Sequence, residues 1–466
     1  MNEHPSIVGA SLGGDLSDRP PAIGRPFDAI GGVADDAGHR INKIQQDKTS
    51  VALDNMRGLV ILLVLAFHSV MAYLGFLGSS TLPFDQPPYE WRAFPIVDSH
   101  RWFGFDIFCA SQDVYLMSLF FFLSALFAWP SLERKGSRKF LGDRLLRLGV
   151  PFVFGLAIVA PIALYPAYRV TAADPSPITY GRRYLSLPFW PDGPMWFLWQ
   201  LLALAVLLTA LRRFAPRCVE FLGWLSSRAI DRPVRYFVGL ATICALAYVP
   251  LALAFTPWQW SEYGPFSMQL SRPLLYAVYY FAGFGIGACG LERGLLATDG
   301  KFARRWSLWL AVALASFMLW MGLTALAMSD TAQFLPQLGS DISYALAGAS
   351  GCFFMIAVFL RFGAARSRIL GYLSHNAFGL YLFHYVFVVW LQYALLGLAL
   401  IAIAKAAIVL AGTLILAWAA TAALRFSRFG SRLIGEKPPG VGERHRGAGF
   451  SLMKGELGLE RSQTAL

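Results

Sequence analysis

The chain has 466 residues, of which 56% are hydrophobic and 15% charged, and its mean hydropathy is +0.51. This composition excludes an ordinary soluble enzyme and predicts an all-α, polytopic integral membrane protein. The net charge of +12 does not indicate a nucleic-acid partner, because the basic residues lie between apolar blocks, as they do in cytoplasmic loops. The five cysteines stand far apart without a CxxC or Cys/His cluster, so we expect neither a disulfide framework nor a metal site.

Residues 1–50 are rich in Gly, Asp, Pro and Ala without periodicity, and we expect them to form a disordered cytoplasmic tail. Ten apolar segments follow, each near the ~20 residues that a helix needs to span the hydrocarbon core. They lie at 58–77, 114–130, 148–166, 195–211, 234–254, 273–290, 306–328, 342–360, 376–396 and 398–424. We therefore expect a transmembrane domain over 51–425 and a basic, Gly-rich, disordered cytoplasmic tail over 426–466 that meets anionic lipids.

The orientation of these segments follows from their flanking charges, because cytoplasmic loops retain Lys and Arg. Basic residues follow each even-numbered segment: Arg134, Lys135, Arg138, Lys139, Arg144 and Arg147; Arg212, Arg213, Arg217, Arg228, Arg232 and Arg235; Arg293, Lys301, Arg304 and Arg305; Arg361, Arg366 and Arg368; Arg425, Arg428, Arg432 and Lys437. The other loops are acidic or mixed. Both termini are therefore predicted to be cytoplasmic.

Two loops on the predicted non-cytoplasmic side are long and rich in aromatic and polar side chains. The loop at about 78–113 and the loop at about 167–194 carry Tyr89, Trp91, His100, Trp102, Arg169, Arg182, Arg183 and Trp190. These residue types suit stacking on a sugar and hydrogen bonding to it. They are equally typical of an aromatic belt at the membrane interface. No internal repeat is apparent, which disfavours a transporter built from duplicated halves.

Arg57 and His68 are eleven residues apart, close to three turns of an α-helix, so they share one face about 16 Å apart along the axis. Arg57 lies at the predicted cytoplasmic mouth and His68 near mid-membrane. An ionisable side chain at that depth faces protein or a water-filled cavity, and a neutral imidazole there can take a proton from a hydroxyl. The alternative is a histidine that only hydrogen-bonds across helices.

Arg144 and Arg147 begin the third segment in the sequence DRLLRLGVP and, on a regular helix, share a face. Guanidinium groups clustered at a cytoplasmic membrane edge suit phosphate groups. They also suit anionic lipid headgroups and topology alone. His384, in FGLYLFHYVF, is a second intramembrane imidazole, whereas His375 lies on roughly the opposite face of that helix.

In their order along the chain, these pieces resemble the acyltransferase-3 family of integral membrane acyltransferases. The resemblance is carried by LDNMRGLVILLVLAFH (53–68) with its Arg-x10-His, FFFLSALF (120–127), RLLRLGVP (144–151), MWFLWQLL (195–202) and SHNAFGLYLFHYVF (374–387). RLGVP and LYLFHY favour the branch similar to glucan-biosynthesis protein C, which succinylates periplasmic glucans. Two departures are Ser124-Ala125 in place of the usual Ser-Gly, and Pro194-Met195 before Trp196 in place of a common His-Leu pair.

The resemblance implies a bacterial inner-membrane enzyme that moves an acyl group from cytoplasmic acyl-CoA (succinyl-CoA or acetyl-CoA) to a hydroxyl of a periplasmic or cell-surface glycan. It implies no permanently bound cofactor. The Arg57/His68 pair would be the catalytic signature, with His68 as general base, and Arg144 and Arg147 would contact acyl-CoA. His384 and Trp196 are expected to contact the acceptor. The alternative is a transporter or flippase for an anionic or lipid-linked glycan, with the arginines as a phosphate gate and the histidines as a proton relay.

Overall fold

The computed structural model describes residues 28–78, 83–87, 89–290, 294–329 and 334–433. The chain divides into two units, residues 1–44 and residues 45–466. Of the first unit the structure describes only the helical backbone of residues 28–44.

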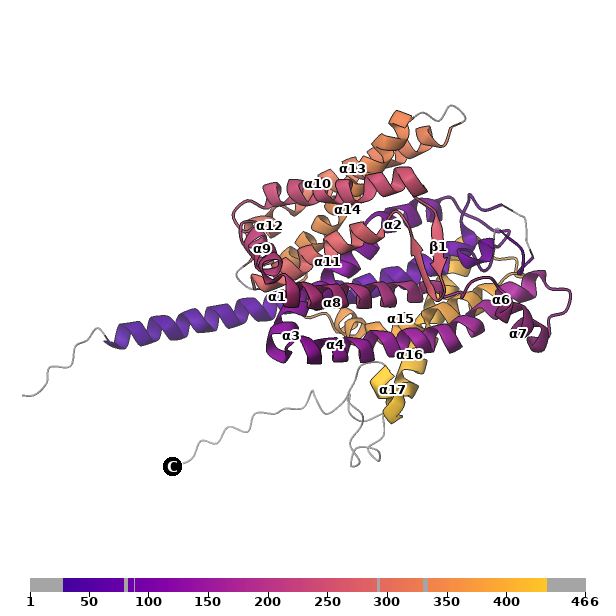
Figure 1. The fold of residues 1–466 in the computed structure, drawn as a ribbon, viewed down its shortest axis with the longest axis horizontal. Helices are drawn as coiled ribbons and strands as arrows, with labels where there is room; N and C mark the ends of the chain where they lie inside the picture. The colour runs from indigo at the N-terminus through magenta and orange to yellow at the C-terminus, as the bar shows by residue number, and fades with distance from the viewer. Residues whose placement is uncertain (1–27, 79–82, 88, 291–293, 330–333, 434–466) are drawn as a thin grey trace, which may run out of the picture. The chain divides into compact units, whose positions relative to one another are not determined.

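The elements in chain order are mostly helices. The α-helices are α1 (Asp28–Val70), α2 (Gly104–Leu126), α3 (Ala128–Lys135), α4 (Ser137–Arg144), α5 (Val150–Phe154), α6 (Ala160–Thr171), α7 (Pro177–Leu185), α8 (Trp196–Phe214), α9 (Pro216–Ser227), α10 (Pro233–Phe255), α11 (Pro273–Ala288), α12 (Lys301–Arg304), α13 (Trp306–Ala327), α14 (Phe334–Phe362), α15 (Arg368–Ala394), α16 (Ala402–Arg425) and α17 (Arg428–Leu433) (Figure 1). The 3₁₀ turns are η1 (Met71–Tyr73), η2 (Glu90–Arg92) and η5 (Gly193–Met195), and the π turns are η3 (Leu145–Gly149) and η4 (Gly155–Val159). Strands β1 (Trp260–Tyr263) and β2 (Phe266–Gln269) form an antiparallel hairpin.

Among the described residues, nine helical segments are long and apolar enough to cross a membrane. They are Lys48–Tyr73, Gly104–Lys135, Ser137–Thr171, Gly193–Phe214, Pro233–Phe255, Trp306–Ala327, Phe334–Phe362, Arg368–Ala394 and Ala402–Arg425. The sixth expected segment, 273–290, is the 16-residue helix α11, which is apolar but shorter than the ~20 residues of a perpendicular span. The structure is that of a helical, polytopic membrane protein.

Three local features differ from the sequence-based expectation. Helix α1 begins at Asp28, where the sequence predicts a disordered tail to residue 50. Residues 39–57 contain no Gly or Pro, so no helix breaker stands between the apolar segment and residue 39; composition does not explain the helix over residues 28–38. Residues 428–433 of the expected C-terminal tail form α17, and residues 1–27 and 434–466 lie outside the described residues. The hairpin β1–β2 was not expected at all.

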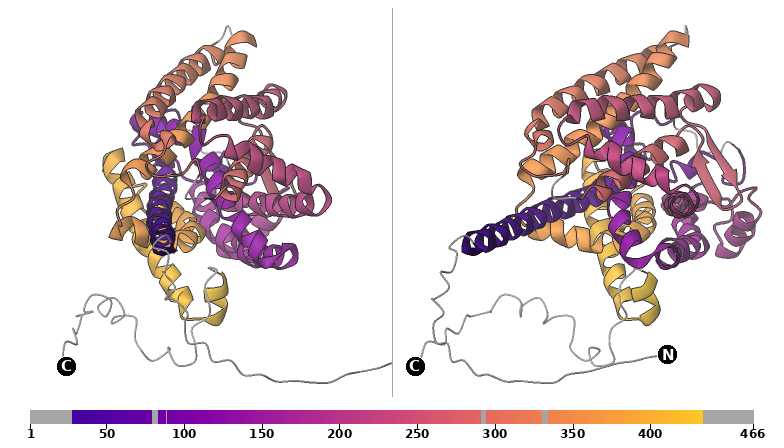
Figure 2. Two further views of the ribbon diagram at one scale, coloured as in Figure 1. Left: turned by 90° about the vertical axis from the view of Figure 1, so that its left-hand side faces the viewer. Right: turned by 60° about the vertical axis from the view of Figure 1, so that its left-hand side comes forward.

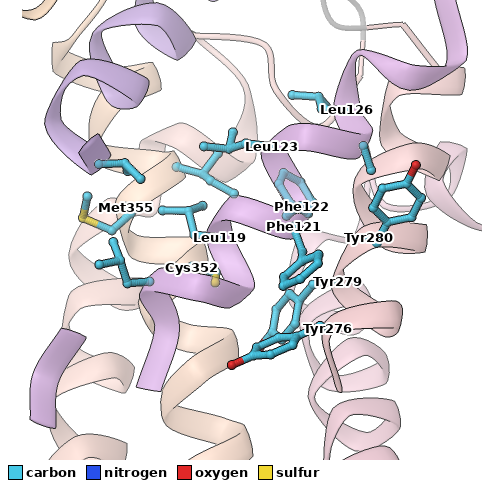
Figure 3. Close-up of a cluster of buried hydrophobic side chains, with 14 of the residues drawn as sticks. Leu119, Phe121, Phe122, Leu123, Leu126, Tyr276, Tyr279, Tyr280, Cys352 and Met355 are labelled. Carbon is cyan, nitrogen blue, oxygen red and sulfur yellow. The ribbon is translucent and has the colours of Figure 1, made fainter. Parts of the chain in front are cut away.

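Helices α2, α11 and α14 form the centre of the larger hydrophobic core (Figure 3). Phe121 of α2 stacks on Tyr276 of α11, with ring centroids 4.7 Å apart. Gly283 and Gly287 of α11 lie directly against the backbone of α2. A Cβ on Gly283 would stand 2.2 Å from a backbone oxygen of α2, and a Cβ on Gly287 would stand 2.1 Å from another, so neither position has room for a side chain. This small-xxx-small spacing is typical of closely packed membrane helices.

Helices α10, α13 and α14 lie side by side (Figures 1 and 2). Phe353 of α14 contacts Phe237 of α10 and Trp309 of α13, each with ring centroids 5.1 Å apart. The Ser316 and Ser350 hydroxyls are 2.9 Å apart across α13 and α14. Such hydrogen bonds between small polar side chains hold membrane helices together where the lipid offers no partner.

Helix α1 makes its closest approach to α15 at Gly58. A Cβ on Gly58 would stand 2.1 Å from the carbonyl oxygen of Leu370. The side-chain amide of Asn55 donates to the carbonyls of Gly363 and Ala365, both at 2.8 Å, so α1 is also tied to the connection that precedes α15. Gly58 and Asn55 thus hold this part of α1 against α15 and the segment before it.

We expect Gly58→Ala to lower the free energy of unfolding by about 1–3 kcal/mol, since the added methyl meets a backbone atom that no rotamer change can move. Denaturant titration of the protein in mixed micelles measures this loss. Gly371→Ala is the matched control, because a Cβ there meets nothing within 4 Å; it is expected to be neutral or mildly stabilising. Equal effects of the two changes would contradict the close approach.

Residues 74–78, 83–87, 89–103 and 172–195 and the hairpin β1–β2 gather at one end of the helices, here termed the loop end. Arg92 pairs with Glu262 of β1, and the Ser267 hydroxyl of β2 donates to Asp192 at 2.6 Å. Trp91 is buried and stacks on Phe84, with ring centroids 4.3 Å apart. The opposite ends of the helices, which carry Arg57, Arg144 and Arg212, are termed the basic end. Their cytoplasmic orientation stays a prediction.

Candidate functional site

His68 of α1 and His384 of α15 lie next to each other inside the protein. Their ring centroids are 4.9 Å apart with the planes at 67°. His384 is fully buried, whereas His68 keeps part of its surface exposed. The sequence placed both imidazoles in the membrane, and the packing of α1 on α15 brings them together.

Backbone carbonyls determine which nitrogen of each imidazole carries the proton. Nδ1 of His68 is 2.9 Å from the Val64 oxygen, and Nδ1 of His384 is 2.6 Å from the Tyr381 oxygen. A carbonyl oxygen only accepts hydrogen bonds, so each neutral ring is protonated on Nδ1 and presents a lone pair on Nε2. Nε2 of His384 is buried and has no hydrogen-bond partner among the described residues. Nε2 of each ring is therefore unprotonated and can accept a proton or a hydrogen bond from a hydroxyl.

The surroundings of the histidine pair come from α1, α15 and η5. The Gln392 amide donates to the carbonyl of His68 at 2.9 Å, which satisfies an oxygen that the end of α1 leaves unpaired. The Tyr385 ring lies 5.8 Å from that of His68, and the Tyr381 hydroxyl donates to the carbonyl of Pro194. Gly193, at φ +49°, packs directly on Tyr385. Tyr381 and Tyr385 thus contact both the histidine pair and η5.

Arg57 does not reach this pair. Its guanidinium lies over the Phe127 ring, 4.3 Å from the centroid, and Nη1 is 3.2 Å from a carboxylate oxygen of Asp54. The side chain is 38% exposed at the basic end. Any influence of Arg57 on His68 acts through α1 or through a ligand that spans the distance.

Arg144 and Arg147 differ in exposure. Arg144 is half-buried over the Phe140 ring at 5.1 Å, whereas Arg147 is exposed. Residues 145–149 form a π turn, which changes the angular offset between the two arginines from that of a regular helix. We had expected one shared face; the structure instead directs Arg144 towards the interior at the basic end and leaves Arg147 outside.

Arg212, at the end of α8, is a third arginine at the basic end, which the sequence suggested only as a topology signal. Its guanidinium lies 5.5 Å from the Trp129 ring, two residues after the Phe127 that supports Arg57. Its Nη1 is buried without a hydrogen-bond partner among the described residues. The stacking partner was hidden from sequence reasoning, because Trp129 and Arg212 are 83 positions apart.

Trp196 is separated from His384 by two aromatic rings, those of Phe197 and Tyr381. Its indole stacks on Tyr276 at 5.9 Å and meets Trp260 of β1 at 5.7 Å. The neighbouring Phe197 contacts Tyr381, which in turn contacts His384. Within the described chain, the structure thus brings His68 and His384 together and leaves Arg57, Arg144 and Trp196 at separate positions around them.

The fold and this site define a class: a polytopic helical membrane protein with paired imidazoles between its helices and arginines at one end. The family model described as an acyltransferase domain matches residues 50–422. The chain therefore belongs to the acyltransferase-3 family and is a membrane acyltransferase. Comparisons with curated proteins and with solved structures gave no match.

Proposed function

We propose that the protein transfers a succinyl or acetyl group from cytoplasmic acyl-CoA to a hydroxyl of a periplasmic or cell-surface glycan, in the inner membrane of a bacterium. The observation that carries the proposal is the His68/His384 pair, whose Nε2 atoms are unprotonated in the neutral rings. A hydroxyl acceptor needs such a base, because the free alcohol is a weak nucleophile. Family membership supports acyl transfer in general.

In this proposal Nε2 of His68 takes the proton of the acceptor hydroxyl while its oxygen attacks the thioester carbonyl. The C–S bond then breaks, an ester C–O bond forms, and the proton passes to the CoA thiolate as it leaves. His384 accepts a hydrogen bond from the acceptor, because a ring protonated on Nδ1 has no proton on Nε2 to offer an oxyanion. Trp196 shapes the acceptor path through its ring contacts.

The donor enters from the basic end. Arg144 and Arg147 hold the CoA phosphates, Arg57 orients the donor, and the pantetheine arm brings the thioester to His68. The ~16 Å between Arg57 and His68 along α1 calls for an extended donor arm of this kind. No side chain needs to move from the basic end to the histidines.

Arg144→Ala is expected to raise the KM for acyl-CoA about 10- to 100-fold, the equivalent of losing one charge-assisted hydrogen bond in a partly buried site. Arg147→Ala is expected to have a smaller effect, because its guanidinium is exposed and screened by solvent. Initial rates of CoA release in proteoliposomes measure both constants. Arg138→Ala, an exposed arginine on α4, is the control. Equal losses in Arg144→Ala and Arg138→Ala would remove Arg144 from the donor site.

The proposal is tested by comparing the masses of periplasmic glucans and surface polysaccharides from cells with and without the gene. Loss of a discrete acyl mass that the wild-type gene restores supports the proposal and identifies donor group and acceptor together. Unchanged acylation, with a glycan or lipid accumulating on the cytoplasmic side, would overturn it in favour of a transporter.

A further inference from the structure

Asp192 is a buried carboxylate that the mechanism above does not use. It lies in the loop between α7 and η5 and is 5% exposed. The Ser267 hydroxyl of β2 donates to its Oδ1 at 2.6 Å. Its Oδ2 is also buried and has no hydrogen-bond partner among the described residues. A buried acceptor left unpaired costs free energy, so it calls for an explanation.

The backbone next to Asp192 touches the wall of the histidine site. A Cβ on Gly193 would stand 3.1 Å from Cε1 of Tyr385, and the Pro194 carbonyl accepts from the Tyr381 hydroxyl. The rings of Tyr381 and Tyr385 both contact His384. Asp192 is therefore placed on the loop-end side of the histidine pair, with a single layer of phenol rings beside it.

The charged and polar groups that face Asp192 leave Oδ2 available. These groups are Arg92 of η2, Tyr184 of α7, Ser267 of β2, and Tyr381 and Tyr385 of α15. Arg92 is engaged elsewhere, since it pairs with Glu262 and its guanidinium lies 4.3 Å from the Phe189 centroid. Burial raises the pKa of Asp192 to about 6, although the hydrogen bond from Ser267 and the charge of Arg92 lower it.

A structural role explains the environment of Oδ1 of Asp192 but not that of Oδ2. The bond from Ser267 to Oδ1 fastens the loop to the hairpin, and an asparagine would accept that bond equally well. An asparagine would, however, present an NH₂ donor where Asp192 has Oδ2. The two roles can therefore be separated by a single isosteric change.

We propose that Oδ2 of Asp192 binds the acceptor by accepting a hydrogen bond from a second hydroxyl of a polyhydroxyl molecule, while the reacting hydroxyl lies at the histidine pair. This inference rests on the proposed function. A carboxylate oxygen recognises hydroxyl donors, and the nearby Tyr184 ring, which is partly exposed, offers an apolar face on which a sugar packs. The site thereby selects acceptors with at least two hydroxyl groups over simple alcohols.

The test uses the full-length protein in proteoliposomes, with a β-glucan oligosaccharide as acceptor probe and acetyl-CoA or succinyl-CoA as donor. Asp192→Asn is expected to raise the KM for the oligosaccharide about 10- to 100-fold and to leave the KM for acyl-CoA unchanged. Asp85→Asn is the matched control, because it neutralises another loop-end aspartate, one that pairs with Arg183 at the surface. Its acceptor KM is expected to stay within twofold of wild type.

The pH dependence gives a readout that a merely structural aspartate would not move. In wild type the acceptor KM is expected to rise as the pH falls below about 6, because protonation removes the carboxylate acceptor. In Asp192→Asn this dependence should be absent. An acceptor KM within twofold of wild type in Asp192→Asn, or an unchanged pH profile, would overturn the inference while acyl transfer itself persists. Absence of acyl transfer by the wild-type protein would instead overturn the proposed function, and the inference with it.

Discussion

Replacing His68 by alanine is expected to reduce acyl transfer by a factor of about 10²–10⁴, the range attributed to a general base, and to bring the rate close to background. The expectation follows from Nε2 of His68, which holds a lone pair because Nδ1 donates to the Val64 carbonyl. Membrane insertion should be unchanged, since the substitution shortens one partly exposed side chain in the apolar part of α1, residues 58–70. The measurement is acyl-CoA-dependent labelling of the oligosaccharide, normalised to the amount of protein in the membrane.

A second variant separates catalysis from packing. His68→Asn places an amide NH₂ where Nδ1 stands, so it retains a donor for the Val64 carbonyl but has no basic nitrogen. If His68 only joins α1 to its surroundings, this variant should retain normal transfer, and the assignment of a base would fail. His375→Ala provides the matched histidine control, because His375 lies exposed on the same helix as His384. It is expected to transfer at the wild-type rate.

Lys405→Met is expected to cause the largest loss of stability, about 3–5 kcal/mol of unfolding free energy. Lys405 of α16 and Asp98 of the first loop form an ion pair at 2.7 Å in which neither side chain is exposed. Methionine fills a similar volume but leaves the Asp98 carboxylate buried without its cation. His100, 3.3 Å from the other carboxylate oxygen, is 42% exposed and replaces little of that interaction. Unfolding in mixed micelles measures the loss.

The double variant Lys405→Met/Asp98→Asn tests the reason for the loss. Removing both charges should recover most of the stability, because no uncompensated charge then remains and the asparagine can still accept from the His100 amide. The ion pair between Lys301 and Asp231 is the surface control. Its N–O distance is 3.5 Å, and its side chains are 62% and 84% exposed. Lys301→Met should therefore change the free energy of unfolding by under about 0.5 kcal/mol. Strictly additive single effects at Lys405 and Asp98 would contradict this account.

Hydropathy was sufficient to locate most of the helices. Eight of the ten expected segments overlap a single long apolar helix each, as 234–254 overlaps α10, because a span must be apolar and internally hydrogen-bonded whatever its neighbours are. Two π turns interrupt the expected third segment, and α11 is shorter than a full membrane span. Hydropathy does not predict π turns or the exact length of a helix, because both depend on how the helix packs against its neighbours. The helical start of α1 at Asp28 was missed because composition favoured a tail.

Some residues of the candidate site could be identified from the sequence, and others only from the structure. Arg57, His68, Arg144 and His384 were identifiable because an ionisable residue within or at the edge of an apolar segment is expensive and therefore conspicuous. Asp192 was not, since a lone aspartate in a Pro- and Gly-rich loop has no sequence signature. Only its burial against Ser267 and the tyrosines of α15 distinguishes it from the exposed loop carboxylates.

The sequence by itself thus determined the class of the molecule, the approximate spans and the intramembrane imidazoles, because these follow from the cost of placing polar atoms in hydrocarbon. The tertiary structure decided which of these groups meet. His68 and His384 are 316 positions apart and become neighbours because α1 packs on α15, closely at Gly58 and through the bond from Gln392 to the His68 carbonyl. The side chains that distinguish one helix pairing from another are nearly all apolar, so pattern alone cannot select the partner; shape complementarity at a few glycines does.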